Sequence, residues 1–217
     1  MEISPRRRKI LTYILLSILA GFILLTILIS FVPIPVIDRE FSEEIQEHQN
    51  PLLDVLMKLV SYPGYSPYSL ILVAGTTLVF YLTRHKKEAL FMFLTSVSGL
   101  ISTIVKVLVN RPRPSEKLVR IVLKTQQQSF PSGHVLFYVV FFGFLTLLMY
   151  MLKHINKTVR LVIVIINMLL IFTIPISRIY LGAHWFTDVL GGFLLGFLYL
   201  AALSYFYLKT PPTIKRR

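Results

Sequence analysis

Residues 10–32 read ILTYILLSILAGFILLTILISFV and contain no charged side chain, directly after a basic run, Arg-Arg-Arg-Lys, at residues 6–9. An uninterrupted apolar run of about 20 residues has the length of a membrane-spanning helix. A cleaved signal peptide has a shorter apolar core and a small-residue cleavage site, which this stretch lacks. We therefore expect residues 10–32 to form a first transmembrane helix that stays in the protein.

Further apolar segments follow, separated by short polar or basic connections. Their approximate limits are residues 68–82, 89–109, 132–152, 161–176 and 184–208. The predicted fold class is therefore all-α, a polytopic membrane bundle of six transmembrane helices that forms one domain over residues 1–217. Residues 52–62 fit equally a short helix at the membrane interface and a packed loop helix. Gly192 and Gly196 form a G-x-x-x-G pattern that is typical of close helix packing.

The distribution of charge predicts the orientation of this bundle. Most of the 23 lysine and arginine residues lie near the two ends of the chain and in the turns at residues 84–87 and 153–160, on one side of the predicted bundle. The positive-inside rule places this side, with both termini, in the cytoplasm of a multi-pass cell-membrane protein. The net charge of +13 thus fits membrane topology and anionic lipid headgroups, and no basic stripe with exposed aromatics indicates nucleic-acid binding. The absence of cysteine excludes disulfide and thiolate chemistry.

Three polar clusters interrupt the apolar sequence, and all three fall on the predicted side opposite the basic turns. Ionisable groups are costly to place in a membrane and usually mark a functional site. Together the clusters supply cations, imidazoles and a carboxylate, which are the groups that phosphoryl transfer needs. They are Lys106-x6-Arg113-Pro114, Pro131-Ser132-Gly133-His134 and Ser177-Arg178-x5-His184-x3-Asp188.

The first two clusters offer ways to hold an anion. Lys106 is either a lysine that extends to the interface or a phosphate ligand, and Arg113 is either a solvated loop residue or a fork for two phosphate oxygens. Arg111 has similar chemistry, and we assign it to the headgroup region. A helix that begins near Ser132 presents free N–H groups to an anion, and Gly133 allows that anion to approach closely.

The histidines offer nucleophilic and acid–base chemistry. His134 stands on an otherwise apolar helix, where an imidazole suits proton donation to a leaving oxygen. His184 and Asp188 are four residues apart and therefore share one face of the last predicted helix. The carboxylate then fixes the tautomer and leaves the other ring nitrogen as nucleophile, unless the pair is purely structural. The surrounding cations disfavour a metal ion, so we predict neither a metal nor a cofactor.

The three clusters together resemble the tripartite signature of the type 2 phosphatidic acid phosphatase (PAP2) superfamily, K-x6-RP, PSGH and SR-x5-H-x3-D, which this chain matches in full over residues 106–188. The resemblance implies a PAP2/haloperoxidase-like helical core. It implies that His184 attacks phosphorus to form a phosphohistidine, that Asp188 orients His184, and that His134 protonates the leaving group. It also implies activity without a metal. The phosphate ligands implied are Lys106, Arg113, Ser132, the Gly133 amide and Arg178.

The resemblance predicts a metal-independent lipid phosphatase, of the bacterial integral-membrane type, with its site on the extracytoplasmic side. The expected substrates are phosphatidylglycerol phosphate, phosphatidic acid or undecaprenyl diphosphate. A phosphotransferase is an alternative, because the same residues would pass the phosphate to another lipid or a sugar. An anion transporter is a second alternative, although transporters place their binding site near the bilayer midplane.

Overall fold

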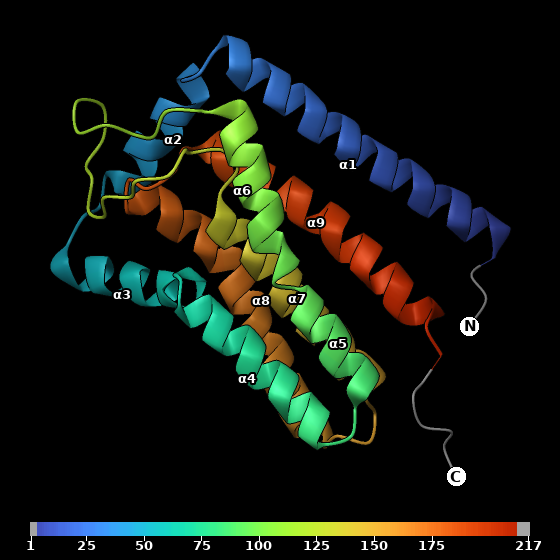
Figure 1. The fold of residues 1–217 in the computed structure, drawn as a ribbon. Coiled ribbons are helices and arrows are strands. Elements are labelled where there is room, and N and C mark those ends of the chain that lie inside the picture. Colours follow the sequence, from blue (N-terminus) through green and yellow to red (C-terminus); the bar gives the residue numbers. More distant parts are fainter. Residues whose placement is uncertain (1–3, 212–217) are drawn as a thin grey trace.

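The computed structural model of the protein describes residues 4–211, and these form nine α-helices, one short 3-10 helix and no strand (Figure 1). The predicted all-α fold class is confirmed. The basic tail at residues 215–217, which contributed to the predicted orientation, lies outside the described residues. The elements are α1 (Pro5–Phe31), α2 (Val36–Gln46), α3 (Pro51–Ser61), η1 (Tyr62–Gly64), α4 (Tyr68–Leu82), α5 (Lys86–Leu94), α6 (Val97–Val109), α7 (Gly133–Met151), α8 (Lys157–Tyr180) and α9 (Phe186–Lys209).

Five segments are long and apolar enough to span a membrane, and two consecutive helices supply a sixth. The five are α1, the α5–α6 pair, α7, α8 and α9. The sixth combines α3 and η1 with α4, across a bend of 54°. With this bent pair counted as one span, the bundle has the six spans that hydropathy predicts.

The third predicted span contains a break that hydropathy does not predict. Helix α5 ends at Leu94 and α6 begins at Val97. Hydroxyl groups bind the backbone at this point: Thr95 donates to the Met92 carbonyl at 2.6 Å, and Ser98 donates to the Thr95 carbonyl at 2.7 Å. Such bonds compete with the helical hydrogen-bond pattern and interrupt the helix while it stays apolar overall.

Helix α3 combines the two alternatives given for residues 52–62. On one side, the Ser177 hydroxyl of α8 donates to the Met57 carbonyl at 2.6 Å, so α3 packs against the bundle. On the other side, Leu52, Leu56 and Leu59 are exposed, as expected of a helix at a membrane interface.

Helix α7 is the centre of the bundle, and it is the most buried of the candidate spans. It is apolar around its whole circumference and packs between α8 and α9. Gly192 and Gly196 of α9 allow the close approach: an added Cβ would lie 2.7 Å from the Ser132 carbonyl oxygen at Gly192 and 2.9 Å from Val139 Cβ at Gly196. The packing role predicted for this glycine pair is confirmed.

The two ends of the bundle differ in character (Figure 1). At one end, the His85 and His154 rings stack at 5.0 Å, which joins the α4–α5 turn to the α7–α8 turn. Lys87 of this end donates to the Thr210 carbonyl just beyond α9, at 2.5 Å. The C-terminal ends of α6 and α8 and the N-terminal ends of α7 and α9 lie at the opposite end, next to α2 (Figure 1). The three polar clusters therefore gather at the end away from the basic turns.

Candidate active site

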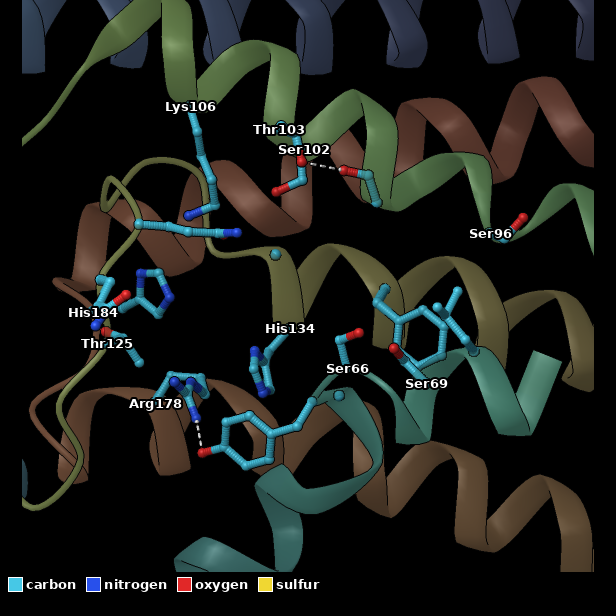
Figure 2. Close-up of a pocket in the computed structure, with 18 of the residues that line it drawn as sticks. Ser66, Ser69, Ser96, Ser102, Thr103, Lys106, Thr125, His134, Arg178 and His184 are labelled. Carbon is cyan, nitrogen blue, oxygen red and sulfur yellow. Dashed lines mark hydrogen bonds between the residues drawn. The ribbon is translucent and has the colours of Figure 1, made fainter. Parts of the chain in front are cut away.

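A cavity of about 440 Å³ opens at the end of the bundle where the three clusters meet (Figure 2). Its walls come from η1, α4, α6, the start of α7, the end of α8 and the loop at residues 125–127. Six of the eight predicted site residues line it, namely Lys106, Arg113, Gly133, His134, Arg178 and His184. The folding of the chain thus brings segments about 70 residues apart in sequence into one cationic space.

Three cations surround this space, each held by neutral oxygen atoms. Lys106 Nζ donates to the Gln128 carbonyl at 2.6 Å, and Arg113 Nη1 donates to the Ala183 carbonyl at 2.5 Å. Arg178 Nη1 donates to the Tyr65 hydroxyl at 2.8 Å. None of the three cations forms an ion pair within residues 4–211. Their charge is therefore available to an anion in the cavity.

Arg113 keeps its charge in this setting. Burial, followed by the positive charge of Arg178, lowers the pKa of Arg113 to about 10. Because this value is well above neutral pH, the guanidinium stays protonated. The part of the shift due to Arg178 reflects two cations that share one buried space, and an anion bound there would offset it.

His184 lies between Arg113 and Asp188. Its Nε2 is 3.4 Å from Arg113 Nη1, and its Nδ1 is 3.4 Å from Asp188 Oδ2. Burial and then the charge of Arg113 hold the pKa of His184 well below its usual value. The imidazole is therefore neutral at physiological pH, which is the state a nucleophile requires.

The local structure around His184 differs from the sequence prediction in one respect. Helix α9 begins at Phe186, with Trp185 as N-cap, so His184 precedes the helix instead of sharing a helical face with Asp188. Asp188 accepts the Trp185 N–H at 2.8 Å on Oδ2, which satisfies a free amide of the first turn. The helix cap, and not the four-residue helical period, brings the carboxylate back toward the histidine.

His134 enters the cavity from the first turn of α7. The Tyr65 ring packs edge-on against it with centroids 4.6 Å apart. Gly64 leaves room for the imidazole, because an added Cβ there would lie 2.4 Å from His134 Cδ2. His134 Nε2 is buried and has no hydrogen-bond partner among residues 4–211, so it is free to exchange a proton with a ligand. Figure 2 shows His134, His184, Lys106 and Arg178 around the same space.

Gly133 and Ser132 have different positions relative to the cavity. Gly133 is the first residue of α7 and lines the cavity, and an added Cβ there would lie 3.0 Å from Ser102 Oγ. The N-cap side chain makes no capping hydrogen bond, which leaves the first-turn amides to an anion. Ser132 itself is buried behind the cavity wall, as is Asp188, and its N–H donates to the Asp188 carbonyl at 2.9 Å.

Arg111 corrects one sequence assignment and adds a residue to the site. The sequence prediction places Arg111 in the headgroup region, but the residue is only 2% exposed and pairs with two carboxylates, Asp38 and Asp188. Arg113, two residues further on, lines the cavity, whereas Arg111 does not. Asp38 lies more than 70 residues before Arg111 in the sequence. It is one of several acidic residues in α2, and nothing in the sequence distinguishes it from the others as the partner of Arg111.

Tyr65 and Ser102 are further cavity residues that sequence reasoning did not identify. Both come from apolar or mixed segments in which a hydroxyl has no distinctive spacing. No group of three or more His, Cys, Asp or Glu side chains in the described part of the chain has the arrangement of a metal site.

Together, the bundle and the cavity define a class of protein: a multi-pass membrane protein with a cationic, imidazole-lined cavity at one end of the bundle. The profile of the PAP2 superfamily matches residues 87–211, which is more than half of the chain. The chain therefore belongs to the PAP2 superfamily, and it is a membrane phosphatase.

Similar proteins and structures agree with this assignment. Phosphatidylglycerophosphatase B of Bacillus subtilis is 29% identical over 74% of this chain and 78% of its own length. Undecaprenyl-diphosphatase BcrC of Bacillus subtilis is 30% identical over 70% of this chain and 76% of its own length.

Two crystal structures resemble the fold. One is a transmembrane PAP2 type phosphatidylglycerolphosphate phosphatase from Bacillus subtilis, with a TM-score of 0.80, 25% identity, and coverage of 92% of this chain and 98% of that one. The other is Aquifex aeolicus LpxE, with a TM-score of 0.61, 25% identity, and coverage of 81% and 97%.

Proposed function

We propose that this protein hydrolyses the phosphomonoester or diphosphate of a membrane lipid, without a metal ion, through a phosphohistidine at His184. The observation that carries the proposal is the single cavity in which unpaired cations and two imidazoles meet at one end of the bundle. Lys106, Arg113 and Arg178 hold the phosphate oxygens, with the amide of Gly133.

The first chemical step forms a bond to nitrogen. Nε2 of His184 attacks phosphorus while the bond from phosphorus to the lipid oxygen breaks. His134 gives its proton to that leaving oxygen. Asp188 lies 3.4 Å from Nδ1 of His184 and stabilises the proton there, so that the lone pair stays on Nε2.

The second step restores the enzyme. Water attacks the phosphohistidine, and His134, now neutral, accepts a proton from it. The bond between phosphorus and His184 breaks, which releases inorganic phosphate. Both histidines return to their starting protonation states, and the cations stabilise the charge that builds up on the phosphoryl oxygens in each step.

A lipid substrate is supported by the direction in which the cavity extends. From the cations it continues between α4 and α6 to Val73 and Ser96, within the apolar part of the bundle. Leu100 and Ile104, on the outer surface of α6, are exposed where lipid would contact the protein. A phosphate can therefore occupy the cationic end while the rest of the substrate leaves toward the bilayer.

The candidate substrates are phosphatidylglycerol phosphate, phosphatidic acid and undecaprenyl diphosphate. The names of the two Bacillus subtilis relatives support a glycerophospholipid and a polyprenyl diphosphate, respectively. We further propose that both termini are cytoplasmic and that the cavity faces the extracytoplasmic side, because the basic turns lie at the other end.

The experiment that tests this function is phosphate release from the three lipids, side by side, in detergent with EDTA present. We expect hydrolysis of at least one lipid, unaffected by EDTA and lost in His184→Ala. Loss of wild-type turnover on adding EDTA would contradict the metal-free mechanism. A rate that requires a second lipid or a sugar as acceptor would identify a phosphotransferase, and transport without bond cleavage would exclude the enzyme.

A further inference from the structure

A buried ion-pair network lies behind the cavity, on the side of Asp188 that faces away from His184. Its central residue is Arg111, which does not line the cavity. Arg111, Asp38, Thr187 and Asp188 are each at most 3% exposed. The network is therefore shielded from water, and its contacts are set by the protein alone.

All three nitrogens of the Arg111 guanidinium donate hydrogen bonds. Nη2 lies 2.5 Å from Asp38 Oδ2, and Nη1 donates to Asp188 Oδ1 and, at 2.7 Å, to Thr187 Oγ1. Nε donates to the Pro33 carbonyl at 2.9 Å. Such a fork fixes both position and rotation of the groups it binds, which a lysine ammonium cannot do.

Asp38 is held from the other side. The Thr187 N–H of α9 donates to Asp38 Oδ1 at 2.8 Å. The carboxylate of α2 thus connects Arg111 to the helix turn that also carries Asp188. Removing either member of the Asp38–Arg111 pair leaves an unpaired charge in a buried place.

The two carboxylate oxygens of Asp188 contact different partners. Oδ1 binds Arg111, whereas Oδ2 faces His184 Nδ1 at 3.4 Å and also accepts from Trp185 N and Ser129 Oγ. A rotation of the carboxylate would break both sets of contacts at once. Arg111 thus fixes the orientation of Asp188 from the Oδ1 side, as Trp185 and Ser129 do from the Oδ2 side, and this orientation sets which oxygen faces the imidazole of His184.

We propose that Arg111 and Asp38 are positioning residues: they hold the Asp188 carboxylate with Oδ2 directed at Nδ1 of His184, and so fix the tautomer that leaves Nε2 as nucleophile. This inference rests on the proposed function, in which His184 is the nucleophile. Without the guanidinium, the carboxylates of Asp38 and Asp188 lose the cation that lies between them and repel each other. The Asp188 carboxylate then turns away from His184 and no longer selects its Nδ1–H form.

The test compares Arg111→Met and Arg111→Lys with a matched control, Arg120→Met. Arg120 forms an arginine–aspartate pair with Asp54 at the same end of the bundle, but its side chain is 41% exposed and it does not contact Asp188. We expect Arg111→Met to lower kcat by about 10–100-fold with little change in KM, as for other residues that orient a histidine. We expect a smaller loss in Arg111→Lys, which keeps the charge, and wild-type kcat in the control.

A second measurement separates positioning from a purely structural role. In an Asp188→Asn background, Arg111→Met should reduce kcat by much less than in the wild-type background, because the carboxylate through which it acts is already absent. The ¹⁵N signals of His184, assigned by their loss in His184→Ala, should report the Nδ1–H tautomer in the wild type and a mixture in Arg111→Met.

Several results would overturn the proposal: wild-type kcat in a folded Arg111 variant, equal losses in both backgrounds, or an unchanged His184 tautomer. If Arg111→Met does not fold, the same measurements are made on Arg111→Lys, and the same results would overturn the proposal. If the wild type releases no phosphate from any lipid, the proposed function fails, while the tautomer of His184 still decides whether Arg111 acts on it.

Discussion

The two sides of Asp188 differ in whether their positively charged residues have carboxylate partners. On the cavity side, Lys106, Arg113 and Arg178 have no carboxylate partner within residues 4–211. On the far side, Arg111 lies between the carboxylates of Asp38 and Asp188.

This difference indicates what each region is for. A buried charge is stable only when it is paired, so the paired Arg111 belongs to the framework of the folded protein. Buried cations that lack a counter-ion are costly unless a ligand supplies the negative charge. We therefore expect the cavity to bind an anion, whereas the network behind it already pairs its cation with carboxylates.

The largest effect is expected from removing the atom that we propose attacks phosphorus. His184→Ala should lower kcat by about 10⁴–10⁶-fold, as loss of a nucleophile does in other covalent enzymes. Phosphate release from the preferred lipid measures this change, with thermal unfolding in detergent as the control for folding. Retention of more than a few per cent of the rate would assign the attack to another group.

A substitution among the unpaired cations should have the next largest effect. Arg178→Gln removes a charge that we expect to stabilise the phosphoryl oxygens, so kcat/KM should fall by about 10²–10³-fold. Because no carboxylate loses its partner, the protein should unfold at an unchanged or higher temperature. A clear loss of thermal stability with normal kinetics would place Arg178 in the framework instead.

The same comparison predicts the response to pH. Burial, with the charge of Arg113 and then of Lys106 and Arg178, lowers the pKa of His184, while Asp188 is the carboxylate that faces it. A lowered pKa means that His184 loses its proton at a lower pH than a free imidazole does, so it stays neutral well below pH 6.5. In a pH profile of kcat/KM, the fall in activity at low pH that reports protonation of His184 should therefore lie clearly below pH 6.5. This fall should move to higher pH in Arg113→Gln, which removes one of the charges that lower the pKa of His184. A fall in the wild type at the pH of a free imidazole would contradict the effect of burial.

The smallest effect is expected from an exposed pair. Arg120→Met removes the contact of Arg120 with Asp54, and should lower the free energy of unfolding by at most about 1 kcal/mol. Arg111→Met should lower it by about 3–5 kcal/mol, because it leaves two buried carboxylates without a partner. Chemical denaturation of the two variants in one detergent compares them directly. Equal losses of unfolding free energy in the two variants would show that burial of the Arg111 network adds nothing to its contribution to stability.

Much of this architecture was predictable from the sequence, because the two strongest signals in it are local. Apolar runs of spanning length predict the helices, and the spacing within the three clusters predicts the residues around the cavity. Hydropathy averages over many residues, however, so it does not register the break at Thr95, where single hydroxyl groups bind the backbone.

The partners of Arg111 were not predictable, because they depend on contacts across the fold. Arg111 and Arg113 are identical in type and two residues apart, and only the packing of α2 against α9 decides which of them meets a carboxylate. The position of His184 before α9, and not on it, likewise follows from the cap at Trp185.

In the mechanism that we propose, a phosphoryl group is transferred from the lipid to His184 in the cavity. The most direct test is to mix the enzyme with a hydrolysable lipid phosphate, quench within a single turnover under alkaline conditions, and locate the phosphate by mass spectrometry of the peptides. We expect a base-stable, acid-labile phosphate on His184 in the wild type and none in His184→Ala. Phosphate on any other residue, or full turnover with no phosphorylated peptide, would contradict this mechanism.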